Sequence, residues 1–291
     1  MKTEEAPTNR IKIAILNAHR LIFSSKKATI GFIIITGYAL VAIFAPLIVP
    51  YDPYAPEFDT WQSPSFEHLF GTTNLGEDIF SQIIWGTRSS FLIAITCGAL
   101  ASLLAVLVGV VGGYKGGLID KVAMGITNIF LVLPTLPLMI VLAAYVRVRG
   151  TFTIILLITI TGWAWDSRVF RSQTLSLKVR EFVKAAKMTG DSDLGILFRE
   201  ILPSLIPLII SGAVGTALYA VVAEASLEFL GLGNPAAVTW GTILYWSVNA
   251  TAHFKEAWWW FLPPGLAIAL LGGGFALLNF ALDEFSNPRL R

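Results

Sequence analysis

Charged residues are scarce in this chain. Asp, Glu, Lys and Arg make up 14% of its 291 residues, hydrophobic residues make up 55%, and the mean hydropathy is +0.70. Soluble domains carry about a quarter charged residues. The shortage of charge therefore excludes an ordinary soluble domain and predicts a protein that lies mostly within a membrane.

Motifs for catalysis and metal binding are also missing. Cys97 is the only cysteine, which excludes an intrachain disulfide, and His19, His68 and His253 have no metal-binding spacing. The sequence contains no Gly-x-x-x-x-Gly-Lys-Ser/Thr loop for nucleotide phosphates and no recognisable Ser-His-Asp or Cys-His set. We therefore expect this chain to have no enzymatic activity, no cofactor or metal of its own and no nucleic-acid partner.

Long apolar runs dominate the sequence instead. A helix needs roughly 20 apolar residues to cross the hydrocarbon core of a membrane, and several windows reach that length without a charge. We predict an all-α polytopic membrane protein with six transmembrane helices, of which the fourth is the shortest. The predicted spans are residues 28–50, 89–114, 122–146, 151–170, 203–230 and 257–282.

Basic residues divide unevenly between the segments that join these spans. Seventeen of the 21 Lys and Arg residues fall on one side of a six-span chain and four on the other. Because basic loops stay cytoplasmic, both termini are predicted to be cytoplasmic. The cytoplasmic segments are then the basic head 1–27, with an interfacial helix over Arg10–Phe23, the loop 171–202 and the tail 283–291, whereas 51–88 and 231–256 are outer loops.

Three residues within the spans are candidates for a pathway or gate through the membrane. Pro134 and Pro137 each remove a backbone donor from the third span, so the helix should bend there, either as a hinge or as a fixed shape. Glu224 continues a line of small residues at every fourth position of the fifth span. Its carboxylate points either into the bundle, which would indicate function, or to the outer surface. Glu228, one turn further out, is expected to be solvated.

The segment 181–203 is charged and water-compatible although apolar runs flank it. Residues 181–187 have the length of two helical turns, Gly190 permits a tight corner, and the polar residues after it suit the N-cap of a second helix. Such a slim knob fits a groove on a soluble partner, and the alternative is an ordinary amphipathic loop. The expected docking residues are Glu181, Phe182, Lys184, Ala185, Ala186, Thr189, Gly190 and Asp191.

The same segment resembles a family signature. An Ala-Ala-x-x-x-Gly pattern with a later Leu-Pro pair is similar to the EAA signature of bacterial ABC importer permeases. It is carried here by Ala185, Ala186, Gly190, Leu202 and Pro203. The first Glu of the signature is Lys184 in this chain, a change that is common in the dipeptide/oligopeptide branch and that removes any salt bridge made by that Glu.

Two further stretches resemble the dipeptide/oligopeptide branch. Residues 68–78, HLFGTTNLGED, are similar to its outer-loop signature HLFGTDxLGRD, with Thr73 for Asp and Glu77 for Arg. Residues 224–233, EASLEFLGLG, followed by Trp-Gly at 240–241, are similar to EASLSFLGLG…WG, with Glu228 for Ser. The resemblance runs along roughly the whole chain and is to the C-type subunit of the Dpp/Opp permeases. The outer-loop residues that we take from it are Gly71, Thr72, Leu75, Gly76 and Asp78.

The resemblance implies the permease fold of a type I ABC importer, with a core permease domain over residues 89–282. It implies a five-part machine in a bacterial or archaeal cell membrane. The other parts are a second homologous permease, two ABC ATPase subunits that bind ATP and Mg²⁺, and an external binding protein that delivers di- or oligopeptides. The segment around Gly190 would be the coupling helix that docks on an ATPase.

Other interpretations stay open at this point. Similar permeases carry oligosaccharides or nickel chelates, and Thr73 and Glu77 depart from the peptide-branch signature, so the cargo is not fixed. Whether the two permeases of the machine differ or are identical is open as well. The alternative of another class is an ion-coupled secondary transporter, which the scarcity of intramembrane carboxylates disfavours. No feature favours a purely structural scaffold.

Overall fold

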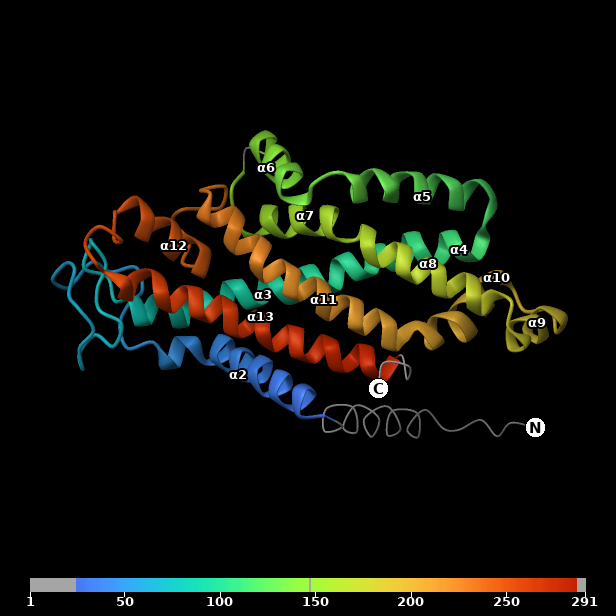
Figure 1. Cartoon of the computed structure of the whole chain (residues 1–291), viewed down its shortest axis with the longest axis horizontal. Helices are drawn as coiled ribbons and strands as arrows, with labels where there is room; N and C mark the ends of the chain where they lie inside the picture. The colour runs from blue at the N-terminus through green and yellow to red at the C-terminus, as the bar shows by residue number, and fades with distance from the viewer. Residues whose placement is uncertain (1–24, 147, 287–291) are drawn as a thin grey trace.

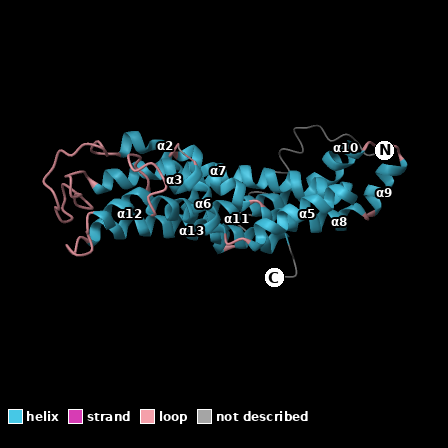
Figure 2. Ribbon diagram, turned by 90° about the horizontal axis from the view of Figure 1, so that it is seen from above, coloured by secondary structure: helices cyan, strands magenta, loops and turns pink. Residues whose placement is uncertain are grey.

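The computed structural model describes residues 25–146 and 148–286, and over this part of the chain it is an elongated bundle of helices (Figure 1). The described residues contain no strand, only an isolated bridge between Thr72 and Asp78. The loop 51–78 lies at one end of the bundle together with α12 (Trp240–Asn249). At the opposite end lie α9 (Glu181–Met188) and α10 (Asp193–Ile196), as Figure 2 also shows. The interfacial helix expected over Arg10–Phe23 lies outside the described residues.

Four helical runs are long and apolar enough to cross a membrane. Many of their large apolar side chains are exposed, for example Ile33 at 62% and Leu47 at 82%, as helices that face lipid require. The runs are α2 (Lys26–Ile48); α3 (Ile79–Ala105) with the π-helical η1 (Val106–Val110) and α4 (Val111–Lys115); α10 with the π-helical η2 (Leu197–Ile201) and α11 (Leu202–Phe229); and α13 (Trp258–Ser286).

The remaining membrane-type helices are interrupted. α5 (Gly117–Val132) and α6 (Thr135–Tyr145) meet at an angle of 97° and give a fifth candidate span if they are counted as one. α7 (Thr151–Gly162) has 12 residues, fewer than a crossing requires, and is followed by the more polar α8 (Ala164–Lys178). The described chain therefore contains four or five candidate spans by length and composition, against six predicted.

The α3 helix begins ten residues earlier than the predicted second span. Asp78 caps it, because its carboxylate accepts a hydrogen bond from the backbone N–H of Ser81 at 2.7 Å. Residues 79–88, which we had assigned to an outer loop, are thus its first turns. The hydropathy pattern missed them because Gln82 and Thr87 are polar, yet both are buried against the rest of the bundle.

Close contacts between backbones hold the long helices together. α11 packs along α3 and α13, and α2 packs along α13 and α3. A Cβ atom on Gly98 of α3 would lie 2.6 Å from the carbonyl oxygen of Ala213 in α11, and one on Gly31 of α2 would lie 2.7 Å from that of Gly274 in α13. Small residues at these crossings allow the helices to approach in the way that membrane helices commonly do.

Candidate functional site

The predicted knob forms a helix, a corner and a second short helix. Gly190 has φ = +86°, a left-handed conformation that glycine adopts without steric cost. Its N–H donates to the carbonyl of Lys187 at 3.2 Å, and the N–H of Asp191 donates to that of Ala186 at 3.1 Å, which closes the end of α9. Ser192 then caps α10 by accepting from the N–H of Gly195 at 3.1 Å.

Two buried side chains anchor this segment, and the predicted docking residues lie on its outside. Val183 and Ile196 are 0% and 1% exposed and pack in one cluster with residues of η1, α8 and η2. Of the eight predicted docking residues, Ala186 is half-buried and the other seven are exposed. Met188 and Leu194 are also exposed, at 83% and 65%. Sequence reasoning missed these two apolar side chains, although each lies within three positions of a residue that it selected.

Tyr114, at the end of the α3–α4 run, joins that run to three other elements. Its hydroxyl donates to the carboxylate of Asp193 in α10 at 2.9 Å. Its carbonyl accepts from the ammonium group of Lys178 in α8. The ammonium group of Lys187 in α9 lies over its ring, 5.6 Å from the centroid. The knob is therefore in direct contact with the end of a long membrane-type helical run.

A bidentate ion pair ties α8 to α5 near the same end of the bundle. The guanidinium group of Arg171 donates to both carboxylate oxygens of Asp120, at 2.5 and 2.7 Å. This hydrogen-bonded carboxylate raises the pKa of Arg171 above its usual value. Such fork-to-fork pairs are geometrically specific, so α5 and α8 are held in one relative position here.

Only one of the two predicted prolines breaks its helix. Pro134 lies between α5 and α6, and Leu133 before it is extended with ψ = 131°, because a residue that precedes proline avoids the helical region. Pro137 lies in the first turn of α6, where its missing N–H costs no intrahelical hydrogen bond. The bend is therefore a full corner at Pro134.

A cavity of about 530 Å³ lies where this corner meets α7, α8, α11 and α13. Two hydrogen-bonded carboxylates line it. Thr216 donates to Asp166 at 3.1 Å, and Ser211 donates to Asp283 at 2.5 Å. No Lys or Arg is among the described residues that line it. Asp166 and Asp283 were not selected from the sequence, because each lies at the edge of an apolar run and the fold alone brings them together.

Glu224 points into the bundle rather than to the outer surface. Its side chain is 0% exposed, and one carboxylate oxygen accepts from the hydroxyl of Ser90 in α3 at 3.1 Å. The other oxygen has no hydrogen-bond partner in the described chain. A buried and incompletely satisfied carboxylate at membrane depth is costly. The structure thus places Glu224 between α3 and α11 and away from the cavity at Asp166.

The expectation that Glu228 is solvated is wrong. Its side chain is 3% exposed and accepts a hydrogen bond from the hydroxyl of Thr239, the N-cap residue of α12. Gly233 and Gly241 make room for it, since a Cβ on either would lie 2.7 Å from its side-chain carbons. The segment between α11 and α12 folds back over the end of α11 and buries Glu228. The local sequence pattern does not indicate this fold-back.

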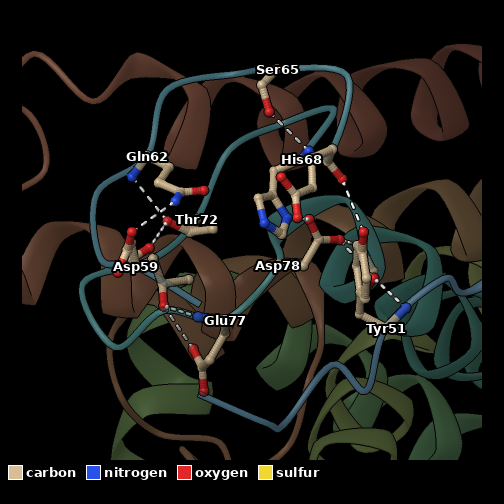
Figure 3. A network of polar contacts seen from close by, with 11 residues as sticks. Tyr51, Asp59, Gln62, Ser65, His68, Thr72, Glu77 and Asp78 are labelled. Carbon is tan, nitrogen blue, oxygen red and sulfur yellow. Dashed lines mark hydrogen bonds and ion pairs between the residues drawn. The ribbon is translucent and has the colours of Figure 1, made fainter. Parts of the chain in front are cut away.

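The outer-loop signature residues shape the loop 51–78 (Figure 3). The ring Nδ1 of His68 lies 2.9 Å from Asp78 Oδ1, and both side chains are 1% exposed. Thr72 accepts from the N–H of Gln62 at 2.9 Å and donates to the carbonyl of Asp59 at 2.7 Å.

Two signature glycines occupy tight turns, and one signature residue faces outward. Gly71 and Gly76 have φ of +67° and +82°, and a Cβ on Gly76 would lie 2.0 Å from the carbonyl oxygen of Phe58. Leu75 is 59% exposed. Within this loop, then, the buried signature residues hold the chain path, and Leu75 is left available for contact.

Comparison with known proteins gives matches along almost the whole chain. Residues 101–291 match the family described as binding-protein-dependent transport system inner membrane component, and residues 17–67 match the N-terminal TM domain of oligopeptide transport permease C. The oligopeptide transport system permease protein OppC of Bacillus subtilis (strain 168) is 36% identical over 270 residues, which cover 92% of this chain and 87% of that protein. The dipeptide transport system permease protein DppC of Alkalihalophilus pseudofirmus is 34% identical over 278 residues, covering 94% and 90% of the two chains.

Proposed function

The chain belongs to the family of inner membrane components of binding-protein-dependent transport systems, and from this membership we propose that it is a permease subunit of an ATP-driven importer of di- or oligopeptides. The peptide cargo is supported by the relatives named OppC and DppC and by the match to the oligopeptide permease C domain. The protein would lie in the bacterial or archaeal inner membrane with several spans.

The topology that we propose has six spans and two cytoplasmic termini. The crossings are α2, the α3–α4 run, the bent pair α5–α6, α7 with the start of α8, α11 and α13. The excess of Lys and Arg on one side supports this orientation. In addition, the loop 51–78, which has acidic residues and no Lys or Arg, lies at the opposite end of the bundle from α9.

The observation that carries the function is the knob formed by α9, Gly190 and α10. It lies at one end of the bundle, seven of its eight predicted docking residues are exposed, and Val183 holds it to the membrane helices. This chain has no nucleotide loop of its own. We therefore assign the knob to docking on one of two separate ABC ATPase subunits, which would hold ATP and Mg²⁺.

The transport step that follows from this assignment is alternating access. Closure of the ATPase dimer would move the knob, and the Tyr114–Asp193 bond would pass that movement to the α3–α4 run. Each nucleotide state then favours one membrane state. The cavity beside Asp166, the corner at Pro134 and the buried Glu224 are the candidates for the pathway and its gate, which this chain would share with a second homologous permease.

Reconstitution tests this function. The tagged chain is purified with whatever subunits accompany it and is placed in liposomes that contain ATP. We expect uptake of a labelled peptide only when the external binding protein and hydrolysable ATP are both present. A cysteine at Ala186, in a background where Cys97 is replaced by serine, should crosslink to an ATPase subunit. Uptake by this chain alone, driven by an ion gradient, contradicts the proposal.

A further inference from the structure

A second pocket lies at the outer end of the bundle, where the loop 51–78 meets α12. Its volume is about 410 Å³, and none of its lining residues lines the cavity beside Asp166. Its characteristic lining residues are one carboxylate and several large apolar or aromatic side chains: Glu77, Tyr54, Leu75, Trp246 and Trp260.

Among the described residues, Glu77 is the one charged residue that lines this pocket. The hydroxyl of Thr73 donates to its Oε2 at 3.1 Å, and the side-chain amide of Gln82 donates to the same oxygen at 2.9 Å. These two bonds fix the carboxylate in place, while its Oε1 has no hydrogen-bond partner among the described residues and the side chain stays half-buried. The pocket therefore presents an oriented negative charge, and none of the described residues that line it is a Lys or Arg.

The rim of the pocket suits the stem of a long basic side chain. Tyr54, Leu75 and Trp246 are 49%, 59% and 47% exposed and line the same pocket as the fixed carboxylate. Aromatic faces beside a carboxylate favour Lys or Arg, whose alkyl stem packs on the rings while its charge meets the carboxylate.

The surroundings indicate that the occupant comes from a protein on the outer side. The sequence from Tyr51 to Thr87 contains acidic residues and no Lys or Arg, so its field attracts a basic surface. Glu77 itself stands where the resembling signature has Arg, so this chain presents the opposite charge at that position. A partner that fits this pocket needs a basic residue there.

We propose that the pocket at Glu77 receives one Lys or Arg side chain of the external binding protein. This inference rests on the proposed function, which supplies the binding protein. The contact makes docking dependent on opposite charges, and it restricts this permease to a binding protein that carries a basic residue at the matching place. Aromatic and basic side chains that become buried on binding are typical of the centre of a protein interface.

The test measures binding of the purified binding protein to the complete permease–ATPase complex in nanodiscs. We expect Glu77→Gln to weaken binding by roughly tenfold, as the loss of one interfacial charge pair does, and to flatten the dependence of the affinity on salt. Glutamine keeps an acceptor for Thr73 and Gln82, so the local fold is retained. Glu67→Gln, which neutralises an exposed carboxylate of the same loop outside the pocket, is the matched control and should bind like the wild type.

A charge exchange identifies the partner residue. Lys and Arg residues of the binding protein are changed to Glu one at a time. One of these variants is expected to bind the wild-type permease complex more weakly and to regain affinity for the complex that carries Glu77→Lys. Equal affinity of the binding protein for the wild type and for Glu77→Gln overturns the inference. If, in addition, Glu77→Gln slows the uptake of cationic peptides alone, the pocket takes cargo and does not receive the binding protein. Failure of the wild-type complex to bind any binding protein contradicts the proposed function itself.

Discussion

The hydroxyl of Tyr114 donates a hydrogen bond to the carboxylate of Asp193 over 2.9 Å, joining residues that are 79 positions apart in the sequence. Tyr114 is 5% exposed at the end of the α3–α4 run, and Asp193 is the first residue of α10 in the knob. This bond is a direct polar link between a transmembrane run and the segment that we assign to ATPase docking.

Removal of this link should weaken the coupling between ATP hydrolysis and uptake. Tyr114→Phe keeps the ring that lies beside Lys178 and Lys187 and deletes only the hydroxyl. A hydrogen bond to a charged group contributes about 1.5–3 kcal/mol, so we expect several-fold fewer peptides imported per ATP hydrolysed and normal membrane insertion. Uptake and phosphate release are measured on the same proteoliposomes.

The matched control for that variant is Tyr145→Phe, because Tyr145 is 84% exposed at the end of α6, which lies well away from α9 along the bundle (Figure 1). It should keep the wild-type ratio of peptide to ATP. If Tyr114→Phe also keeps that ratio, the bond to Asp193 is a static brace and plays no part in transmission.

Substitution of Gly190 separates backbone strain from docking. No atom lies within 4 Å of a Cβ placed on Gly190, so any effect comes from its left-handed φ or from a partner. Gly190→Ala adds only the strain, about 1 kcal/mol, and should retain most uptake. Gly190→Trp adds bulk at the docking surface and should abolish both uptake and substrate-stimulated ATPase activity while the subunits remain in the membrane.

Gly117 supplies the control for this pair. It also has a positive φ, +60°, and no atom lies within 4 Å of a Cβ placed on it, but it is the first residue of α5 and lies outside the knob. Gly117→Trp should therefore lose far less activity than Gly190→Trp. Equal losses in the two variants would show that a disturbed left-handed turn, and no docking contact, accounts for the defect.

Local signals in the sequence were enough to predict the helix–corner–helix shape of the knob and the break in the helix at Pro134. Gly190 and the polar residues after it determine their own turn and cap, and Pro134 restricts Leu133 directly. The 97° angle at that corner depends on the packing of α5 and α6 against other helices, and no local pattern encodes it. The same holds for the interruption at Trp163, which ends α7 well before the predicted end of the fourth span.

Local patterns in the sequence did not predict which polar side chains are buried. Glu228 was expected in water because it lies near the end of an apolar run, yet Thr239 and two glycines from the following segment enclose it. Asp166 and Asp283 line one cavity although 117 positions separate them in the sequence. Contacts of this kind depend on tertiary packing, whereas hydropathy and caps report only on neighbours in the chain.

The contact between Gly109 and α8 should be sensitive to a single methyl group. A Cβ on Gly109 in η1 would lie 2.2 Å from the backbone carbonyl oxygen of Ser167, and a backbone atom cannot move aside as a flexible side chain can. Gly109→Ala should therefore lower stability by roughly 1–3 kcal/mol through overpacking, seen as a lower melting temperature of the purified complex. Gly125→Ala, where a Cβ meets no atom within 4 Å, should leave the melting temperature unchanged or slightly raised. Equal melting temperatures for the two variants would contradict this packing.

The two buried glutamates of α11 should respond to substitution in opposite ways. Glu224→Gln keeps the side-chain shape and an acceptor for Ser90 but removes the ability to carry a negative charge. If the charge serves the gate, uptake falls several-fold while insertion and the melting temperature are retained. Glu228→Ser places the smaller signature residue in a space shaped by Gly233 and Gly241, so it leaves a void and removes the carboxylate that accepts from Thr239.

The void should lower the melting temperature of Glu228→Ser, because lost packing and the loss of a buried hydrogen bond to a carboxylate each cost on the order of 1–3 kcal/mol. The uptake rate per folded complex should fall less than in Glu224→Gln, since Glu228 interacts with Glu224 but is bonded to the cap of α12 and does not line the cavity beside Asp166. Measurement of both quantities for both variants distinguishes the roles. A Glu224→Gln protein that melts early and transports normally would assign Glu224 to packing between α3 and α11 and would remove it from the gate.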